Sequence, residues 1–416
     1  MRDTAGTIDT IDIDVFDPGV FQNGHPHHLF KRLRAECPVY WQKEKSGRGY
    51  WAITKHADIA MIGKDPITFS SRRGGTFIRD YEEGSADLDQ LRYVLPNMDP
   101  PEHVAYRNIV RRAFMPRIIQ SLEPRIRDRV KHIVDRVKPS GGDFVQDVAQ
   151  QLPIQVIAEM LGIPDEDRDQ VFDWGNRLVG FDDPDSPETY ADSLEVSGYV
   201  IGYFGELAQK RFEEPKDDVV SLLLQADVDG QSLQPMEVAM LMMLLIVAGH
   251  ETTRNTIAGG MLALIENPDQ RDRLLANMQM MPTAVEEFLR WVAPITYFRR
   301  TATKELILRG QKIKEGDKVV LYYPSANHDE EVFRDADAFD VGRTPNDHLS
   351  FGMGQHVCIG STLARLELKL MFEGLLQRFP RMRVTGPITR YRSNFVNGIR
   401  TMPVEYEPVV QVSMAG

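Results

Sequence analysis

The most informative stretch of this sequence is the decapeptide Phe351-Gly352-Met353-Gly354-Gln355-His356-Val357-Cys358-Ile359-Gly360. It holds three glycines and one of the chain's two cysteines, and a helix-periodic segment follows it. Glycines let a backbone turn tightly and approach a flat object closely. A cysteine just before a helix N-terminus meets the positive end of the helix dipole and unpaired amide groups, which stabilise its thiolate.

The chemistry of Cys358 is restricted by the absence of a second cysteine near it in sequence. A structural zinc site needs four ligands, whereas haem iron takes a single axial thiolate. The alternative for a lone cysteine is a buried, inert thiol. The glycine spacing and His356 favour the axial ligand.

The decapeptide resembles the haem-binding signature of the cytochrome P450 family, Phe-Gly-x-Gly-x-His-x-Cys-x-Gly, and matches it at every position. Two further segments resemble family motifs and precede it in the family's order. They are Glu287-Phe288-Leu289-Arg290, which resembles Glu-x-x-Arg, and Ala248-Gly249-His250-Glu251-Thr252-Thr253, which resembles the oxygen-activation segment of the long central helix. The similarity covers nearly the whole chain.

This resemblance implies the fold and the roles of particular residues. The fold is mainly α, a triangular helical domain with small β-sheets at the edge, formed by residues 1–416 as a single domain. Cys358 is the implied thiolate ligand of haem b, with O2 as co-substrate. Thr252 is implied to hydrogen-bond dioxygen and Glu251 to relay protons. Glu287, Arg290 and Arg343 form the implied structural ion network.

Other residues are implied to surround the haem or the substrate. The implied haem contacts are His103, Arg107, Arg300, His356, Phe351, Gly352 and Gly360. Among these, the two arginines and two histidines match family residues that hold the haem propionates. Buried carboxylates need such cationic partners. Taken alone, each of these polar residues is an ordinary surface group. The register predicts a mainly apolar distal pocket lined by Leu244, Ala248, Thr296, Tyr297, Phe395 and Val396. Segments 72–97 and 170–200 are expected to form a lid.

Three regions resemble bacterial members of the family that act on terpenoids, steroid side chains and branched lipids. They are the segments that begin at Arg290 and at Tyr323, and Asn394 to Ile399. This likeness indicates an apolar substrate of one of these kinds. The chain carries no recognisable flavin or nucleotide motif, so electrons are expected from a separate ferredoxin and its reductase. Five basic residues lie near the decapeptide, which we call the cysteine loop: Arg111, Arg112, Arg117, Arg365 and Lys369. Two interpretations of them are equally supported. They form a docking patch for ferredoxin, or they are scattered solvated side chains.

Composition excludes several classes of protein. The 416 residues carry a net charge of -12, which argues against nucleic acid as a partner. Two cysteines form no disulfide framework, so a reducing, cytoplasmic setting is expected. The N-terminal segment predicts no signal peptide. The longest apolar run, Val238 to Gly249, is about 12 residues, short of the roughly 20 that cross a bilayer.

Periodicity predicts a mostly helical chain. Helices are expected near 27–36, 102–114, 117–137, 146–160, 190–213, 235–267, 281–293 and 361–379, and strands near 39–42, 49–53, 305–308, 318–322 and 402–406. The segment 235–267 is apolar on all sides up to Val247 and then abruptly polar. Either something approaches the helix near Gly249, or the helix simply emerges into solvent there.

Two rival functions remain. A peroxide-using peroxygenase on this fold usually lacks the acid–threonine pair, and a non-catalytic haem ligand binder needs no proton delivery. His25, His27 and His28 resemble a metal cluster but are interpreted as loop residues, and Cys37 as a partly buried ordinary thiol. Met240, Met242 and Met243 are interpreted as core packing.

Overall fold

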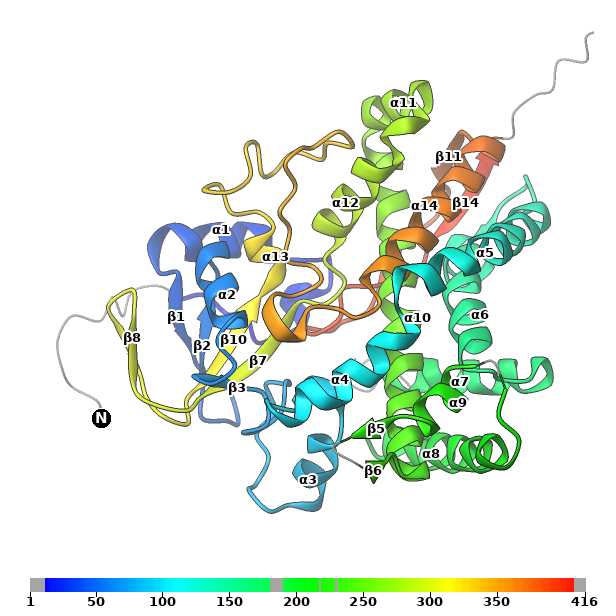
Figure 1. Cartoon of the computed structure of the whole chain (residues 1–416). Helices are drawn as coiled ribbons and strands as arrows, with labels where there is room; N and C mark the ends of the chain where they lie inside the picture. Colours follow the sequence, from blue (N-terminus) through cyan, green and yellow to red (C-terminus); the bar gives the residue numbers. More distant parts are fainter. Residues whose placement is uncertain (1–11, 180–189, 217, 229–230, 408–416) are drawn as a thin grey trace, which may run out of the picture.

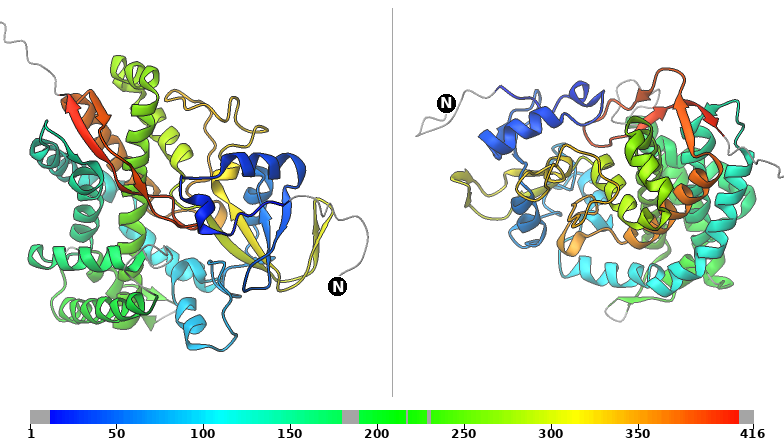
Figure 2. Two further views of the ribbon diagram at one scale, coloured as in Figure 1. Left: turned by 180° about the vertical axis from the view of Figure 1, so that it is seen from behind. Right: turned by 90° about the horizontal axis from the view of Figure 1, so that it is seen from above.

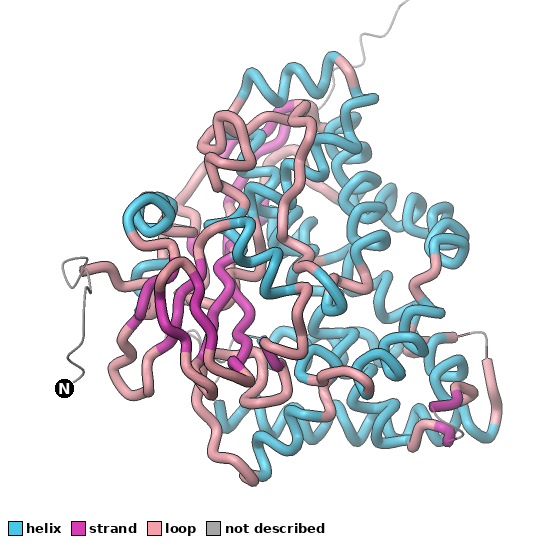
Figure 3. The backbone as a smooth tube through the Cα atoms, turned by 60° about the vertical axis from the view of Figure 1, so that its left-hand side comes forward, coloured by secondary structure: helices cyan, strands magenta, loops and turns pink. Residues whose placement is uncertain are grey.

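The computed structural model describes residues 12–179, 190–216, 218–228 and 231–407. Most helices gather on one side and the larger sheet lies on the other, which produces a roughly triangular outline (Figure 1). Figure 3 separates the two regions by colour, with most strands together at one side of the helical mass. The helices are α1 (His27–Glu36), α2 (His56–Gly63), α3 (Ala86–Arg92), α4 (Glu102–Ala113), α5 (Pro116–Arg136), α6 (Gln151–Met160), α7 (Arg168–Val179), α8 (Tyr190–Glu213), α9 (Val219–Leu224), α10 (Pro235–Glu266), α11 (Pro268–Ala276), α12 (Met281–Val292), α13 (Tyr323–Ala326) and α14 (Ser361–Arg378).

Helix α10 is the central element and runs the height of the molecule, as Figure 2 shows from behind. Pro235 occupies its first turn, Gln234 and Glu237 form a capping box, and Asn267 precedes the proline that begins α11. It packs on α6, α8, α12 and α14. By length and composition α10 is apolar enough to cross a membrane, but half of its apolar window is buried inside the protein. This burial is typical of a core helix.

The polar half of α10 does not emerge into solvent, so that alternative is wrong. Glu251, Thr253, Arg254, Asn255 and Thr256 are all buried. Burial of polar groups costs free energy unless they are paired, and here Glu251, Arg254 and Asn255 hydrogen-bond to one another. Gly249 faces α6, where an added Cβ would lie 3.4 Å from Ile157, an ordinary packing distance. The expectation that something approaches the helix near Gly249 stays a prediction.

The larger sheet has the order β1-β2-β10-β7-β3, formed by β1 (Val39–Gln42), β2 (Tyr50–Ile53), β10 (Lys318–Tyr322), β7 (Tyr297–Ala302) and β3 (Phe69–Ser70). Only the β10–β2 pair is parallel. Successive side chains of β7 point to opposite faces. Tyr297 packs in one apolar core with Tyr50 and Tyr322, while Phe298 packs in the other with Tyr323. The second face is therefore the one that turns towards the cysteine loop.

Smaller sheets lie around this frame. The C-terminal one has the order β11-β14-β4, from β11 (Arg381–Val384), β14 (Pro403–Glu407) and β4 (Gly142–Asp143). Three two-stranded ladders are β8 (Leu306–Leu308) with β9 (Gln311–Ile313), β12 (Thr389–Arg390) with β13 (Ile399–Thr401), and β5 (Asp227–Val228) with β6 (Gln231–Ser232). A π-helical turn, η3 (Val145–Ala149), replaces the first part of the helix predicted at 146–160.

Candidate active site

The cysteine loop is held by short-range backbone contacts. The backbone N–H of Cys358 donates to the carbonyl of Phe351 at 2.8 Å, which closes the loop on itself. Gly354 has φ 75°, and a Cβ there would lie 2.1 Å from the carbonyl oxygen of Gly63 at the end of α2. Only glycine permits both that conformation and that approach. Two residues after Cys358 the loop leads through Gly360, the N-cap, into α14.

The Cys358 side chain is exposed, although protein surrounds its sulfur closely enough that burial raises the pKa of the thiol. A side chain that is both accessible and surrounded faces an internal space. The backbone N–H of Gly360 and the charges of Arg107 and Arg365 act in the opposite direction and favour the thiolate. The sulfur is thus prepared for a cation, which would stabilise the thiolate further.

Arg107, on α4, and Arg300, on β7, lie with His103 and His356 in a cationic cluster. The rings of His103 and His356 are 4.0 Å apart, centroid to centroid. Burial, together with the charges of Arg107 and Arg300, lowers the pKa of His103 to about 4 and that of His356 to about 2. His103 Nδ1 is buried without a hydrogen-bond partner.

No described carboxylate forms an ion pair with either arginine of the cationic cluster; Arg107 donates instead to the Val357 carbonyl at 2.5 Å, and Arg300 to that of Arg299 at 2.9 Å. A buried charge needs a partner. The cluster is therefore complementary to carboxylates that the chain itself does not supply, and it lies beside the cysteine loop. These residues would fit the propionates of a haem.

Helix α10 presents an accessible stripe although its surroundings are buried. Leu244, Ala248 and Thr252 are spaced by four residues and therefore share one face. Ala248 is exposed and the other two are partly exposed, in the middle of an otherwise buried helix. The hydroxyl of Thr252 donates to the Ala248 carbonyl at 2.9 Å. This stripe borders an open space, as the predicted distal pocket requires.

Glu251 points away from that stripe and is only 4% exposed. Its Oε1 accepts from Arg254 and, at 3.0 Å, from Asn255 Nδ2. Arg254 in turn donates to the Tyr391 hydroxyl at 2.9 Å and lies over the Tyr391 ring. This network was not predicted from the sequence. The spacing of Glu251 and Arg254 is a signal for their pairing, but nothing in the sequence connects them with Tyr391.

The structure brings Glu287, Arg290 and Arg343 together. Arg290 donates twice to Glu287, at 2.8 and 2.7 Å, and Arg343 Nε donates to it at 3.1 Å. Glu287 and Arg290 are completely buried. The remaining guanidinium donors reach backbone carbonyls, among them those of Asn327, Ala336 and Ala338. The network therefore ties α12 to the segment that runs from Asn327 to Arg343, before the cysteine loop. It contacts none of the site residues described above.

The predicted pocket residues divide into two groups. Val396, which forms a bridge with Ile295, lies next to Thr296, whose N–H donates to the Phe395 carbonyl at 2.8 Å. Tyr297 is buried, with its ring 5.3 Å from that of Phe395 and 6.1 Å from that of Tyr322, so its place in the pocket stays a prediction. Phe298, on the same face of β7 as Arg300, lies 6.0 Å from the Phe395 ring and was not among the predicted residues.

The remaining candidates are resolved by their contacts. Arg111, Arg112 and Arg117 are exposed, while Arg365 and Lys369 already pair with Glu286 and Glu373. Cys37 is partly buried, as expected. Of the lid segments, 180–189 lie outside the described residues.

The N-terminal histidines are not simple loop residues. His25 hydrogen-bonds the carbonyls of Val292 and Ala293, and the His27 ring lies 3.9 Å from that of His328. Among the described residues no group of three or more His, Cys, Asp or Glu side chains is arranged to hold a metal ion.

Comparison with known proteins agrees with this geometry. A family model described as "Cytochrome P450" matches residues 199–384. The chain is 38% identical over 403 residues to the steroid C26-monooxygenase of Rhodococcus jostii (strain RHA1), covering 95% of this chain and 84% of that protein. It is 37% identical to the linalool 8-monooxygenase of Pseudomonas putida, covering 95% and 99%. The structure of Mycobacterium marinum cytochrome P450 CYP268A2 in complex with pseudoionone is 35% identical, with a TM-score of 0.88 over 97% of this chain and 100% of that one.

Proposed function

The chain belongs to the cytochrome P450 family of monooxygenases, and from this premise we propose that it inserts one oxygen atom of O2 into a C–H bond of an apolar terpenoid or steroid. Its electrons come from a separate ferredoxin. The observation that carries the proposal is the accessible sulfur of Cys358 beside a cationic cluster that lacks anionic partners. We also propose a soluble, cytoplasmic protein.

The chemistry of the residues in the site suits haem b. Cys358 binds the iron, and Gly360 N–H, Arg107 and Arg365 stabilise its thiolate. His103, Arg107, Arg300 and His356 hold the propionates, which supply the missing negative charge. When bound, the haem supplies the iron at which dioxygen is reduced and cleaved. Phe351, Gly352 and Gly360 shape the loop that would lie against the haem.

Proton delivery falls to Thr252 and Glu251. The Thr252 hydroxyl rests on the Ala248 carbonyl and, by rotation about its Cα–Cβ bond, donates its proton into the pocket. Glu251 must first leave Arg254 and Asn255, because their hydrogen bonds occupy its Oε1. Once it turns, the carboxyl carries a proton from the Tyr391 side of α10 towards Thr252. Positioned proton transfer of this kind contributes typically about 10²–10⁴-fold to a rate.

An apolar substrate suits the lining of the pocket. Leu244 and Ala248 of α10 face Phe395, Val396 and Thr296 of the C-terminal and β7 segments in the proposed arrangement. The relatives named for steroid and linalool oxidation support this substrate class. Arg111, Arg112 and Arg117 form the proposed docking patch for an acidic ferredoxin, since they are exposed and have no carboxylate partner among the described residues.

Turnover tests the proposal. The purified haem protein is supplied with a surrogate ferredoxin, its reductase and NAD(P)H, and terpenoids and steroids are screened for a blue shift of the Soret band. We expect hydroxylated product from the compounds that cause the shift. Product formed equally well from hydrogen peroxide without redox partners would identify a peroxygenase. Binding without product under either condition would identify a ligand binder.

A further inference from the structure

Glu286 joins α12 to α14 beside the cysteine loop, and no step of the proposed mechanism uses it. The residue directly precedes Glu287 in sequence, but its side chain belongs to a different cluster. Its two carboxylate oxygens accept from Arg365, from Nε at 2.7 Å and from Nη2 at 2.8 Å. This fork-on-fork geometry is the strong form of an ion pair. It connects two helices whose residues are 79 positions apart in sequence.

His348 is the third member of this cluster. Its Nδ1 accepts from Ser350 N–H at 3.2 Å, so the ring hydrogen is on Nε2, which donates to Glu286 Oε2 at 3.1 Å. An imidazole with one accepting nitrogen is neutral. Burial acts against the charge of Glu286, but the hydrogen bonds from Arg365 and His348 lower its pKa to about 2. The cluster therefore holds one negative and one positive charge at neutral pH.

Both partners of Glu286 lie against Phe351, the first residue of the cysteine loop. The guanidinium carbon of Arg365 is 4.6 Å from the centre of the Phe351 ring, and the centre of the His348 ring is 5.9 Å from it. The carbonyl of Phe351 accepts from Cys358 N–H at 2.8 Å. Glu286 thus reaches Cys358 only through these neighbours, which makes it a positioning residue and not a catalytic one.

The charge balance of the pair matters because of what lies beside it. The charge of Arg365 favours the Cys358 thiolate. Charges near an axial ligand change the reduction potential of the iron that it binds. Reduction adds an electron, so a nearby positive charge favours the ferrous state and a nearby negative charge favours the ferric state. Glu286 opposes the effect of Arg365, because its oxygens lie within hydrogen-bond distance of the guanidinium.

We propose that Glu286 sets the reduction potential of the haem iron by compensating the charge of Arg365 beside Phe351 and Cys358. The inference rests on the proposed ligation of the iron by Cys358. Without the Glu286 carboxylate, the guanidinium is an uncompensated cation next to the thiolate, and the iron becomes easier to reduce. The carboxylate therefore keeps the potential lower than Arg365 alone would set it.

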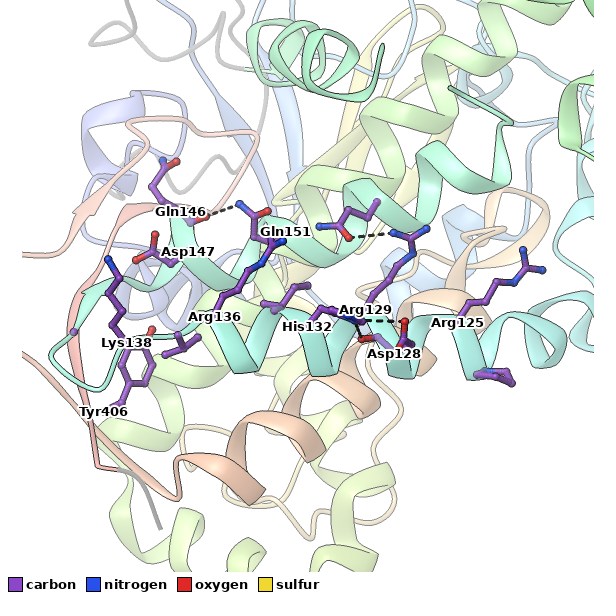
Figure 4. Close-up of a pocket in the computed structure, with 15 residues that line it drawn as sticks. Arg125, Asp128, Arg129, His132, Arg136, Lys138, Gln146, Asp147, Gln151 and Tyr406 are labelled. Atoms are coloured by element: carbon purple, nitrogen blue, oxygen red, sulfur yellow. Dashed lines mark hydrogen bonds and ion pairs between the residues drawn. The ribbon is translucent and has the colours of Figure 1, made fainter. Parts of the chain in front are cut away.

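A similar pair elsewhere in the chain provides a matched control. Arg129 of α5 donates to Glu159 of α6 through Nε at 3.0 Å and through Nη2. Figure 4 shows Arg129 on the wall of a groove between α5 and the η3–α6 segment, and none of the residues that line this groove belongs to the active site. Like Glu286 and Arg365, the two residues are partly exposed. Neither is among the charges that act on Cys358.

Potentiometric titration of the substrate-free haem protein, followed by its Soret band, measures the ratio of ferrous to ferric haem at a fixed solution potential. Glu286→Gln should raise this ratio at least about threefold over the parent, and Arg365→Gln should lower it at least about threefold. The double variant restores the charge balance, so its ratio should lie within about twofold of the parent. Glu286→Asp keeps the negative charge and should also stay within about twofold.

The controls Glu159→Gln and Arg129→Gln change the net charge of the chain by the same amounts and should keep the parent ratio. A loss of packing alone would not move the two single variants in opposite directions. Opposite shifts together with a parent-like double variant support the proposal. Each single variant tests one sign by itself, so the proposal stays testable if the other does not bind haem.

The ferrous carbon monoxide spectrum of the parent is recorded first. A parent without the red-shifted band would overturn the proposed ligation by Cys358 and this inference with it. With the band present, an unchanged ratio in either single variant overturns the inference alone. Shifts of the same sign in both, or equal shifts in the Glu159→Gln control, overturn it as well.

Discussion

Glu251 and Thr252 are neighbours in α10, yet their side chains lie on different sides of the helix. The Glu251 carboxylate is buried against Arg254 and Asn255, whereas the Thr252 hydroxyl rests on the Ala248 carbonyl beside the accessible stripe. One residue of an α-helix turns through about 100°, so the two groups cannot face one space without a change of rotamer. The acid and the hydroxyl therefore make separable contributions to proton delivery, which mutation can distinguish.

Thr252→Ala should uncouple electron use from product formation. The variant should bind haem and substrate and oxidise NAD(P)H, but most electrons should leave as hydrogen peroxide, because the donor to the pocket is gone. Product per NAD(P)H should fall about tenfold or more. Thr256→Ala is the control, since its hydroxyl makes the same kind of bond, to the Thr252 carbonyl at 2.8 Å, one turn further into the core. Equal coupling in the two variants would remove Thr252 from proton delivery.

Arg254→Lys should change the availability of Glu251 rather than the binding of substrate. The shorter, single-point donor loses the planar guanidinium that bonds both Glu251 and Tyr391. We expect kcat and its pH profile to change while KM for substrate stays within about twofold. Glu251→Gln should slow turnover about 10²-fold or more and show a different solvent isotope effect from the parent. An unaltered pH profile in Arg254→Lys would mean that the pair serves only to stabilise the fold.

Glu287→Ala should give little soluble haem protein. It leaves Arg290 and Arg343 without their buried carboxylate, and breaking such a network costs roughly 3–5 kcal/mol. Glu305→Ala, which removes an exposed pair with Lys312, should cost less than about 1 kcal/mol. The yield of haem-loaded protein and its urea unfolding measure both. A stable, haem-loaded but inactive Glu287→Ala would instead place Glu287 in the chemistry.

Some features of the fold and of the candidate site could be predicted from the sequence, and others could not. The ends of α10 and α14 follow from Pro235, Asn267 and the cysteine loop, because proline and glycine act locally. β7 was missed, since its Arg299-Arg300 pair reads as polar although both are buried. Contacts between distant segments, such as Arg254 with Tyr391 or His27 with His328, carry no local signal.

Acid should weaken the fold through His25. Burial lowers the pKa of His25 to about 4, despite its hydrogen bonds to the carbonyls of Val292 and Ala293. In the unfolded chain the imidazole titrates near 6.5, so between these values the unfolded state binds the extra proton. The free energy of unfolding should therefore fall as pH drops from about 6.5 to about 4, and this loss should stop below pH 4.

Urea unfolding at a series of pH values measures that slope. His25→Gln keeps a donor for the two carbonyls but does not titrate, so its free energy of unfolding should depend less steeply on pH than that of the parent. His132→Gln, on the exposed part of α5, should keep the parent slope. Identical slopes in the parent and His25→Gln would show that acid acts through other groups.

The central claim is that Cys358 is the only protein ligand to the haem iron, and the ferrous carbon monoxide spectrum tests it most directly. A thiolate ligand gives a strongly red-shifted Soret band. We predict this band for the parent protein and for Cys37→Ser, which changes the other cysteine. Cys358→His should bind haem but give the unshifted band of a histidine-ligated haem. A red-shifted band in Cys358→His, or its loss in Cys37→Ser, would contradict the account.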